Sequence, residues 1–271
     1  MIDPAIEKAK SSVDGFTLPC GFLSPDGAIW TDIQVREITG EEEEILAAKN
    51  MSPVKKINKV MANCTVSIGP ASGKEVEAII PDLPQGDRLF LLLAIRRTSL
   101  GDEMPFEAKC PSCERDSQLT VDLSELEIKP MPDPKIRTYS VVLPRSQKSV
   151  LMKVMTGRGE ELVSKVVTAA GKDGLTASLL ARTESVDSAP ATLDTLKSLS
   201  LADRNYMRDQ FEEHEGGVDT EVEVECPGCG FEFFTDIDFG AAGFFNPSAA
   251  LKIWRKRSST LPNHGDGQKS R

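Results

Sequence analysis

Polar and apolar residues alternate in two regions of the chain that each contain a Cys-x-x-Cys motif. Residues 221–225 read Glu-Val-Glu-Val-Glu, which is typical of a strand with one exposed face, and residues 231–234 follow the second motif. Residues 105–109 and 119–123 flank the first motif in the same way. The pattern predicts a β-hairpin with a cysteine motif at its tip in each region.

The segments upstream of the hairpins predict further elements. Residues 83–98 and 201–213 are predicted helices that lead into the two hairpins. Residues 16–20 and 29–38 are predicted strands, joined by a turn with the sequence Ser-Pro-Asp-Gly. Thr39 is a predicted helix N-cap, so the acidic run that follows it is interpreted as a first helical turn rather than as a metal-binding cluster. The predicted fold class is α+β.

The two cysteine motifs belong to a longer internal repeat. At an offset of 116 residues, eight of the 37 positions in 87–123 are identical, and they include Asp87-Arg88 against Asp203-Arg204 and Cys-Pro-x-Cys against itself. At an offset of 117, Thr39-Gly40 matches Thr156-Gly157. The repeat predicts a tandem duplication of α+β halves, each ending in a zinc-knuckle β-hairpin. Chance similarity between two unrelated zinc hairpins is the alternative.

The repeat also sets the expected organisation of the chain. We predict an N-terminal arm (1–15), a first half (16–128), a Pro-rich linker (129–136), a second half (137–240) and a basic C-terminal tail (241–271). Duplicated halves can pack about a pseudo-two-fold axis, as subunits do in a symmetric dimer. Each half would then contribute one knuckle to a shared site.

Four of the six cysteines form a candidate metal site. Two Cys-x-x-Cys turns supply the four thiolates that a tetrahedral zinc ion binds, and the predicted ligands are Cys110, Cys113, Cys226 and Cys229. The motifs lie much further apart than in an ordinary zinc ribbon, so separate thiol pairs or a degenerate site remain alternatives, as does redox chemistry at one motif. Cys20 and Cys64 have no partner at motif spacing and are interpreted as small buried residues.

The formal net charge of −10 hides an uneven distribution. The segment from Lys252 onward carries six basic residues and one acid, a net charge of +5, so the first 251 residues carry −15. This acidic body argues against binding to duplex nucleic acid. In the tail, Trp254, Arg255, Lys256 and Arg257 are candidate partner-binding residues on a short amphipathic segment, although a solvated terminus is the simpler interpretation.

The sequence contains few signals of catalysis, of a membrane span or of secretion. The two histidines, His214 and His264, have no nucleophile at a recognisable motif spacing. Gly157-Arg158-Gly159 is not followed by the residues of a phosphate-binding loop. The longest apolar run, residues 89–95, is far shorter than the roughly 20 residues that span a bilayer, and the N-terminus lacks the pattern of a secretory signal. We expect a non-enzymatic protein that is not secreted.

The order of motifs resembles that of a known family. Phe16-Thr17-Leu18-Pro19-Cys20-Gly21 leads through the Pro-Asp-Gly turn into Val35-Arg36-Glu37-Ile38-Thr39-Gly40, and Cys-Pro-x-Cys and Val-Asp-Leu follow. In this the chain resembles the baseplate hub assembly family of contractile-tailed phages, the T-even-type baseplate proteins. The resemblance covers residues 16–128 directly and 137–239 through the repeat.

The resemblance implies a structural or assembly role. Such a protein would contact other tail and baseplate hub proteins within a larger symmetric assembly, and it would be found in the virion tail baseplate or in the host cytoplasm during assembly. A zinc-ribbon adaptor that binds nucleic acid or another protein through the basic tail, and a thiol redox protein, are the alternative functions.

Overall fold

Two four-stranded antiparallel sheets have the same strand order, with each strand beside the next strand of the chain. The structure is a computed structural model, and it describes residues 13–171, 173–237 and 244–245. The first sheet contains β1 (Val13–Leu23), β2 (Ile29–Arg36), β3 (Thr65–Ile68) and β4 (Ala71–Ser72). The second contains β8 (Thr138–Val142), β9 (Ser149–Lys153), β10 (Thr183–Val186) and β11 (Ala189–Pro190).

Helices follow the strands in a matching order. After the first two strands of each sheet come α1 (Gly40–Ala47) and α2 (Pro53–Cys64), or α5 (Gly157–Ala170) and α6 (Gly174–Ala181). After the last two come α3 (Lys74–Ile79), the 3-10 turn η1 (Ile80–Asp82) and α4 (Gln85–Leu100), or α7 (Leu193–Lys197) and α8 (Leu201–His214). The predicted α+β class is confirmed, with several small sheets.

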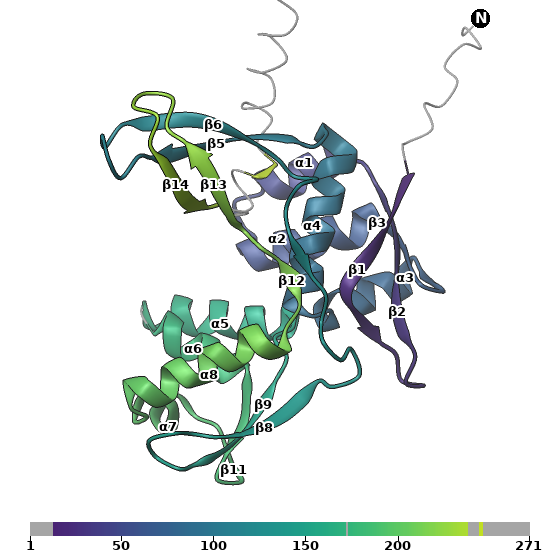
Figure 1. The fold of residues 1–271 in the computed structure, drawn as a ribbon. Coiled ribbons are helices and arrows are strands. Elements are labelled where there is room, and N and C mark those ends of the chain that lie inside the picture. The colour runs from purple at the N-terminus through teal and green to yellow at the C-terminus, as the bar shows by residue number, and fades with distance from the viewer. Residues whose placement is uncertain (1–12, 172, 238–243, 246–271) are drawn as a thin grey trace, which may run out of the picture.

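Two β-hairpins follow α4 and α8. The first pairs β5 (Glu103–Lys109) with β6 (Asp116–Asp122), and the second pairs β13 (Glu221–Glu225) with β14 (Glu232–Asp236). Figure 1 shows the two hairpins side by side, above the body that contains the second sheet. A short ladder between β7 (Ile128–Lys129) and β12 (Gly217–Val218) joins the chain segments that lead to and from that body.

Local sequence explains where the helices begin. Thr39 caps α1 in a capping box with Glu42, which is itself buried and paired with Arg36 at 2.9 Å. Ser52 accepts a hydrogen bond from a first-turn N–H of α2, and Ser200 does the same for α8. The predicted helix start after Thr39 is therefore confirmed.

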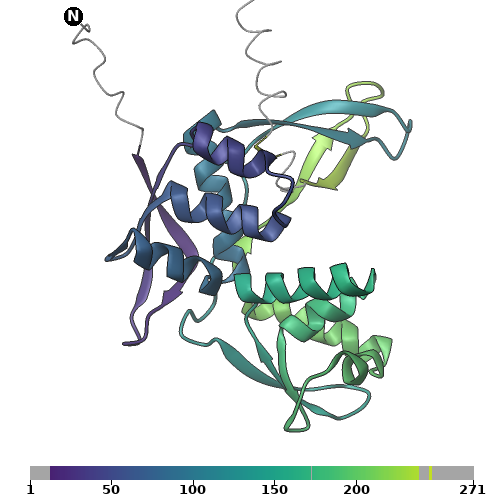
Figure 2. The same cartoon turned by 180° about the vertical axis from the view of Figure 1, so that it is seen from behind.

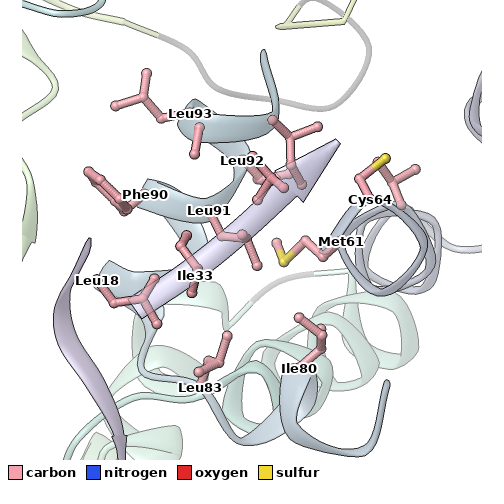
Figure 3. Close-up of a cluster of buried hydrophobic side chains, with 14 of the residues drawn as sticks. Leu18, Ile33, Met61, Cys64, Ile80, Leu83, Phe90, Leu91, Leu92 and Leu93 are labelled. Atoms are coloured by element: carbon pink, nitrogen blue, oxygen red, sulfur yellow. The ribbon is translucent and has the colours of Figure 1, made fainter. Parts of the chain in front are cut away.

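The larger hydrophobic core packs α4 between the first sheet and α2. Figure 3 shows Phe90, Leu91, Leu92 and Leu93 of α4 in a cluster that also contains Leu18 and Ile33 of the sheet and Met61 of α2. The apolar run that is too short for a membrane span is thus the central helix of this core. In the part of the chain that the structure describes, no helix is long and apolar enough to cross a membrane.

The packing does not divide the chain at the middle of the repeat. The smaller core contains residues between Tyr139 and Phe211. Beyond α8 the chain returns to the larger core, where Ile237, Phe244 and Phe245 are buried and Val218 and Val222 pack against it. Both hairpins therefore extend from the body that contains α4, and α5–α8 with the second sheet form a separate body (Figure 2).

Candidate metal centre

The two Cys-x-x-Cys turns have the same backbone hydrogen bonds. The N–H of Cys110 donates to the carbonyl of Arg115 at 3.0 Å, and the N–H of Glu114 donates to the carbonyl of Cys110 at 2.9 Å. In the second turn the equivalent donors are Cys226 and Gly230, each at 2.9 Å from its acceptor. The turns therefore present their cysteines in equivalent positions.

One residue of each turn needs a left-handed backbone. Gly230 has φ +71°, which glycine adopts without strain, while Glu114 occupies the matching position with φ +56°. A side chain in this region costs roughly 1–2 kcal/mol. The first turn thus reaches the geometry of the second without the glycine that favours it.

The turns bring four sulfur atoms together. The Sγ atoms of Cys110 and Cys229 lie 3.8 Å apart, those of Cys113 and Cys226 lie 3.7 Å apart, and all four lie within 4.8 Å of one another. Zinc–sulfur bonds of about 2.3 Å in a tetrahedron give sulfur–sulfur separations of about 3.8 Å. The arrangement fits one tetrahedral metal ion. Among the described residues it is the one group of three or more His, Cys, Asp or Glu side chains that could hold an ion.

The environment of the cluster favours a thiolate at Cys226 and disfavours one at Cys229. The first cysteine of each turn is buried and the second is exposed. The backbone N–H of Gly228 donates to Sγ of Cys226 at 3.4 Å, and this bond, with others from Cys229 and Cys110, lowers the pKa of Cys226 to about 6. Burial and hydrogen bonds with the other three sulfurs raise the pKa of Cys229 to about 12. The guanidinium of Arg115, from the first hairpin, lies against Gly228, so each turn contacts the other beyond its cysteines.

Four cysteine ligands leave no coordination position for a substrate. Structural zinc sites are of this closed type, whereas catalytic zinc keeps an open position for water. What the cluster can do chemically is hold an ion that ties the first hairpin to the second. The ligands come from segments 116 residues apart, so such an ion would close a long loop of chain.

The remaining cysteines are buried apart from the cluster. Cys20 and Cys64 are 1% and 0% exposed, and burial raises the pKa of both thiols, that of Cys64 to about 12. Both are therefore neutral thiols within the fold. The prediction that they are small buried residues is confirmed.

Other candidate residues have structural contacts. His214 ends α8 and stacks on Tyr139, with ring centroids 3.8 Å apart. A Cβ on Gly157 would lie 2.7 Å from the Arg88 guanidinium, and Arg158 pairs with Asp82, so the Gly-Arg-Gly segment packs against the first body. The predicted partner-binding residues Trp254, Arg255, Lys256 and Arg257, together with His264, lie outside the described residues.

Asp87 and Asp203, which align at the offset of 116 residues, each accept a hydrogen bond from a backbone N–H. Oδ1 of Asp87 accepts the N–H of Cys20 at 2.7 Å, and Oδ1 of Asp203 accepts the N–H of Arg145 at 2.8 Å. Both donors follow a Leu-Pro pair. The two sites differ electrostatically: burial raises the pKa of Asp87 to about 7, and its Oδ2 has no partner among the described residues. Burial acts the same way on Asp203, but N–H donors and Ser200 outweigh it, and the pKa is lowered.

Arg88 and Arg204, the residues that follow these aspartates, also make equivalent hydrogen bonds. Nη1 of Arg88 donates to the carbonyl of Ile80 at 3.0 Å, and Nη1 of Arg204 donates to the carbonyl of Leu196 at 2.9 Å. Arg88 has an additional role, since its side chain is 1% exposed and pairs with Glu160 of α5 at 2.8 Å. This pair connects the two bodies.

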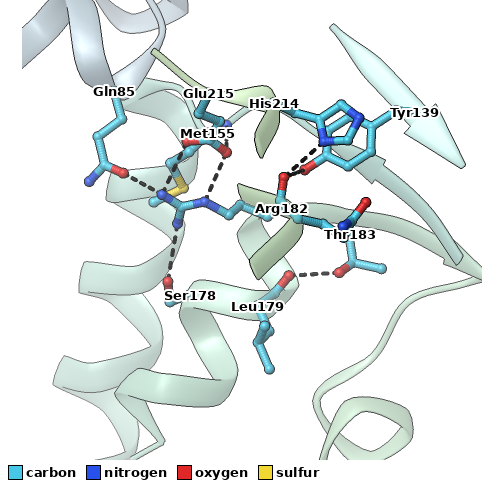
Figure 4. Close-up of polar contacts among 10 residues, drawn as sticks. Gln85, Tyr139, Met155, Ser178, Leu179, Arg182, Thr183, His214 and Glu215 are labelled. Atoms are coloured by element: carbon cyan, nitrogen blue, oxygen red, sulfur yellow. Dashed lines mark hydrogen bonds and ion pairs between the residues drawn. The ribbon is translucent and has the colours of Figure 1, made fainter. Parts of the chain in front are cut away.

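A second polar network at the junction was not predicted from sequence. Figure 4 shows Arg182 between Glu215, Ser178 and Gln85, and Gln85 belongs to α4 of the other body. Neighbouring backbone bonds run from Gln85 N–H to the Met155 carbonyl, at 2.8 Å, and from Gly157 N–H to the Leu83 carbonyl. Arg182 lies outside the repeated motifs, so only the three-dimensional contacts identify it.

Comparison with known proteins identifies a family. A family model described as T4 bacteriophage base plate protein matches residues 24–246, which is most of the chain. No curated protein and no solved structure matches.

Proposed function

The chain belongs to the T4 bacteriophage base plate protein family, and on this premise we propose that it is a non-enzymatic component of a contractile-tail baseplate, acting in the hub or as a hub assembly chaperone. In this proposal a structural zinc ion, bound by Cys110, Cys113, Cys226 and Cys229, fixes the two hairpins together. The protein works by contacts with other baseplate proteins, in the virion tail or in the host cytoplasm during assembly.

The observation that carries the proposal is the closed four-sulfur cluster. Its sulfur–sulfur distances of 3.7 and 3.8 Å suit a zinc tetrahedron, and its four thiolates leave no site for a substrate. Binding energy at such a site contributes to folding rather than to catalysis. A rigid pair of hairpins suits a protein whose function is to be assembled with others.

We propose further that the chain is a tandem duplication of halves 16–128 and 137–240, joined by the linker 129–136. Support comes from the matching order of strands and helices and from the equivalent bonds of Asp87 and Asp203. The duplication accounts for the origin of the two segments but not for how they pack, because the second hairpin packs on the first body.

A pseudo-two-fold axis is proposed for the cysteine cluster. Exchanging the two motifs turns the Cys110–Cys229 contact into the Cys226–Cys113 contact, and the two distances differ by only 0.1 Å, at 3.8 and 3.7 Å. The exchange also takes the buried Cys110 to the buried Cys226 and the exposed Cys113 to the exposed Cys229. The ion would lie on this local axis.

The experiment is metal analysis combined with co-purification. The full chain should contain one zinc per molecule and elute with other baseplate proteins when they are expressed together, while the Cys110→Ser variant should lose the metal. A chain without metal that forms a reversible Cys110–Cys113 disulfide would instead indicate a thiol redox protein. Salt-sensitive retention of nucleic acid would favour the adaptor function.

A further inference from the structure

A groove with an apolar floor lies between the start of α1 and the end of α4. Its volume is about 250 Å³, and its apolar floor consists of Ile38, Leu46, Leu100 and Phe245. Leu100 is 42% exposed and Ile38 and Leu46 are half-buried. Phe245 belongs to the larger core, and Ile38 and Leu46 pack against it.

The α1 side of the groove carries acidic side chains, and a cation lies near it, since Nζ of Lys56 donates to the carbonyl of Leu46 at 2.7 Å. Glu43 lines the groove, and Glu41 and Glu44 are exposed on the same helix turn of α1. None of the ion pairs among the described residues includes these three carboxylates. An occupant that suits both the floor and the acidic α1 side would have apolar and cationic residues together.

The chain itself arrives at this groove. Phe245 is 7% exposed, packs in the larger core and is part of the apolar floor. The segment that follows Phe245 therefore begins at the groove. Leu251 and Trp254 are three residues apart, the spacing of one helix face, and Lys252, Arg255, Lys256 and Arg257 accompany them. Leu251 is six residues beyond Phe245, which spans at most about 20 Å of extended chain.

We propose that residues 248–257 of the same chain cover the groove, with Leu251 and Trp254 on the apolar floor and the basic residues against the acidic α1 side. The occupant matches the groove in polarity and in sign of charge, and its attachment point is already in place. The proposal goes beyond the baseplate role, because it assigns the basic segment an intramolecular site. A partner that binds this segment has to displace it.

Tryptophan fluorescence of the full-length, zinc-loaded chain tests the proposal. The chain contains two tryptophans, so Trp30→Phe leaves Trp254 as the only one. We expect Trp254 to be protected from acrylamide and to emit at shorter wavelength than in the unfolded chain. Adding Leu100→Glu should remove the protection, whereas Leu175→Glu, at a 72% exposed leucine of α6, should leave it unchanged.

Charge reversal gives a second test that does not alter the apolar floor. Glu43→Lys should increase quenching of Trp254, and the control Glu75→Lys, at an exposed position of α3, should not. Circular dichroism and thermal unfolding verify that each variant is folded. Trp254 quenched as in the unfolded chain, or unaffected by both groove variants, would overturn the proposal. Protection that disappears on dilution would also overturn it, because the occupant would then be the tail of a second copy.

Discussion

Replacing Cys113 by serine removes one sulfur from the cluster without creating a buried cavity. Cys113 is exposed, and its Sγ lies 3.7 Å from that of Cys226. A serine hydroxyl does not replace a thiolate as a zinc ligand. The substitution therefore tests the metal cross-link separately from hydrophobic packing.

The expected loss follows from the length of the loop that the ion closes. Cys113 and Cys226 are 113 residues apart in sequence. By analogy with a disulfide, a cross-link across about 100 residues stabilises by about 4.7 kcal/mol through the entropy of the unfolded chain. We expect the free energy of unfolding in zinc to fall by about 4 kcal/mol, a large part of the 5–15 kcal/mol typical of a domain.

Urea unfolding followed by circular dichroism measures this difference, with zinc content determined by mass spectrometry. Wild type and Cys113→Ser should differ in zinc and become nearly equal in a chelator. Ser112→Ala, an exposed neighbour in the same turn, is the matched control and should behave as wild type. The reasoning is refuted if Cys113→Ser keeps both the metal and the stability of wild type, or if the chelator leaves wild type unchanged.

Three further substitutions test other features of the fold. Asp87→Asn should flatten the pH dependence of stability: because the pKa of Asp87 rises from 3.8 to about 7 on folding, stability falls as pH rises through that window, by at most about 4 kcal/mol. Thermal unfolding at several pH values checks this, and an unchanged slope in the variant would contradict it. Glu114→Gly should raise the unfolding free energy by up to about 1 kcal/mol, since Gly230 shows that the turn needs positive φ; equal or lower stability in urea counts against this. Gly86→Ala should destabilise by about 1–3 kcal/mol or more, because its Cβ would lie 2.0 Å from the carbonyl oxygen of Gly216, and a calorimetric midpoint equal to that of wild type would contradict the close approach.

Local signals in the sequence predicted much of the fold. The Thr39 cap, the helix before each hairpin and the hairpins themselves depend on residues close together in the chain, and their observed bounds differ from the predicted ones by a few residues. The repeated Asp-Arg pair was a usable signal for the equivalent bonds of Asp87 and Asp203. The zinc-ligand assignment stays a prediction, supported by the proximity of the four sulfurs.

Contacts between distant segments could not be predicted in the same way. The return of Phe244 and Phe245 to the larger core depends on which apolar surface is left uncovered once the sheets have formed. The bond from Arg182 to Gln85 depends on how the two bodies meet. Such contacts reflect non-local packing, for which neither periodicity nor motif spacing provides a signal.

The separation of the two cysteine motifs along the chain also sets an order of events during synthesis. At about 5–20 residues per second, the ribosome delivers the second motif roughly 6–25 seconds after the first. During that interval the first hairpin offers only the two thiols of Cys110 and Cys113. An ion that needs all four sulfurs can be captured only after the intervening body has been synthesised. A bound ion would therefore indicate that the two hairpins of that chain are already in contact.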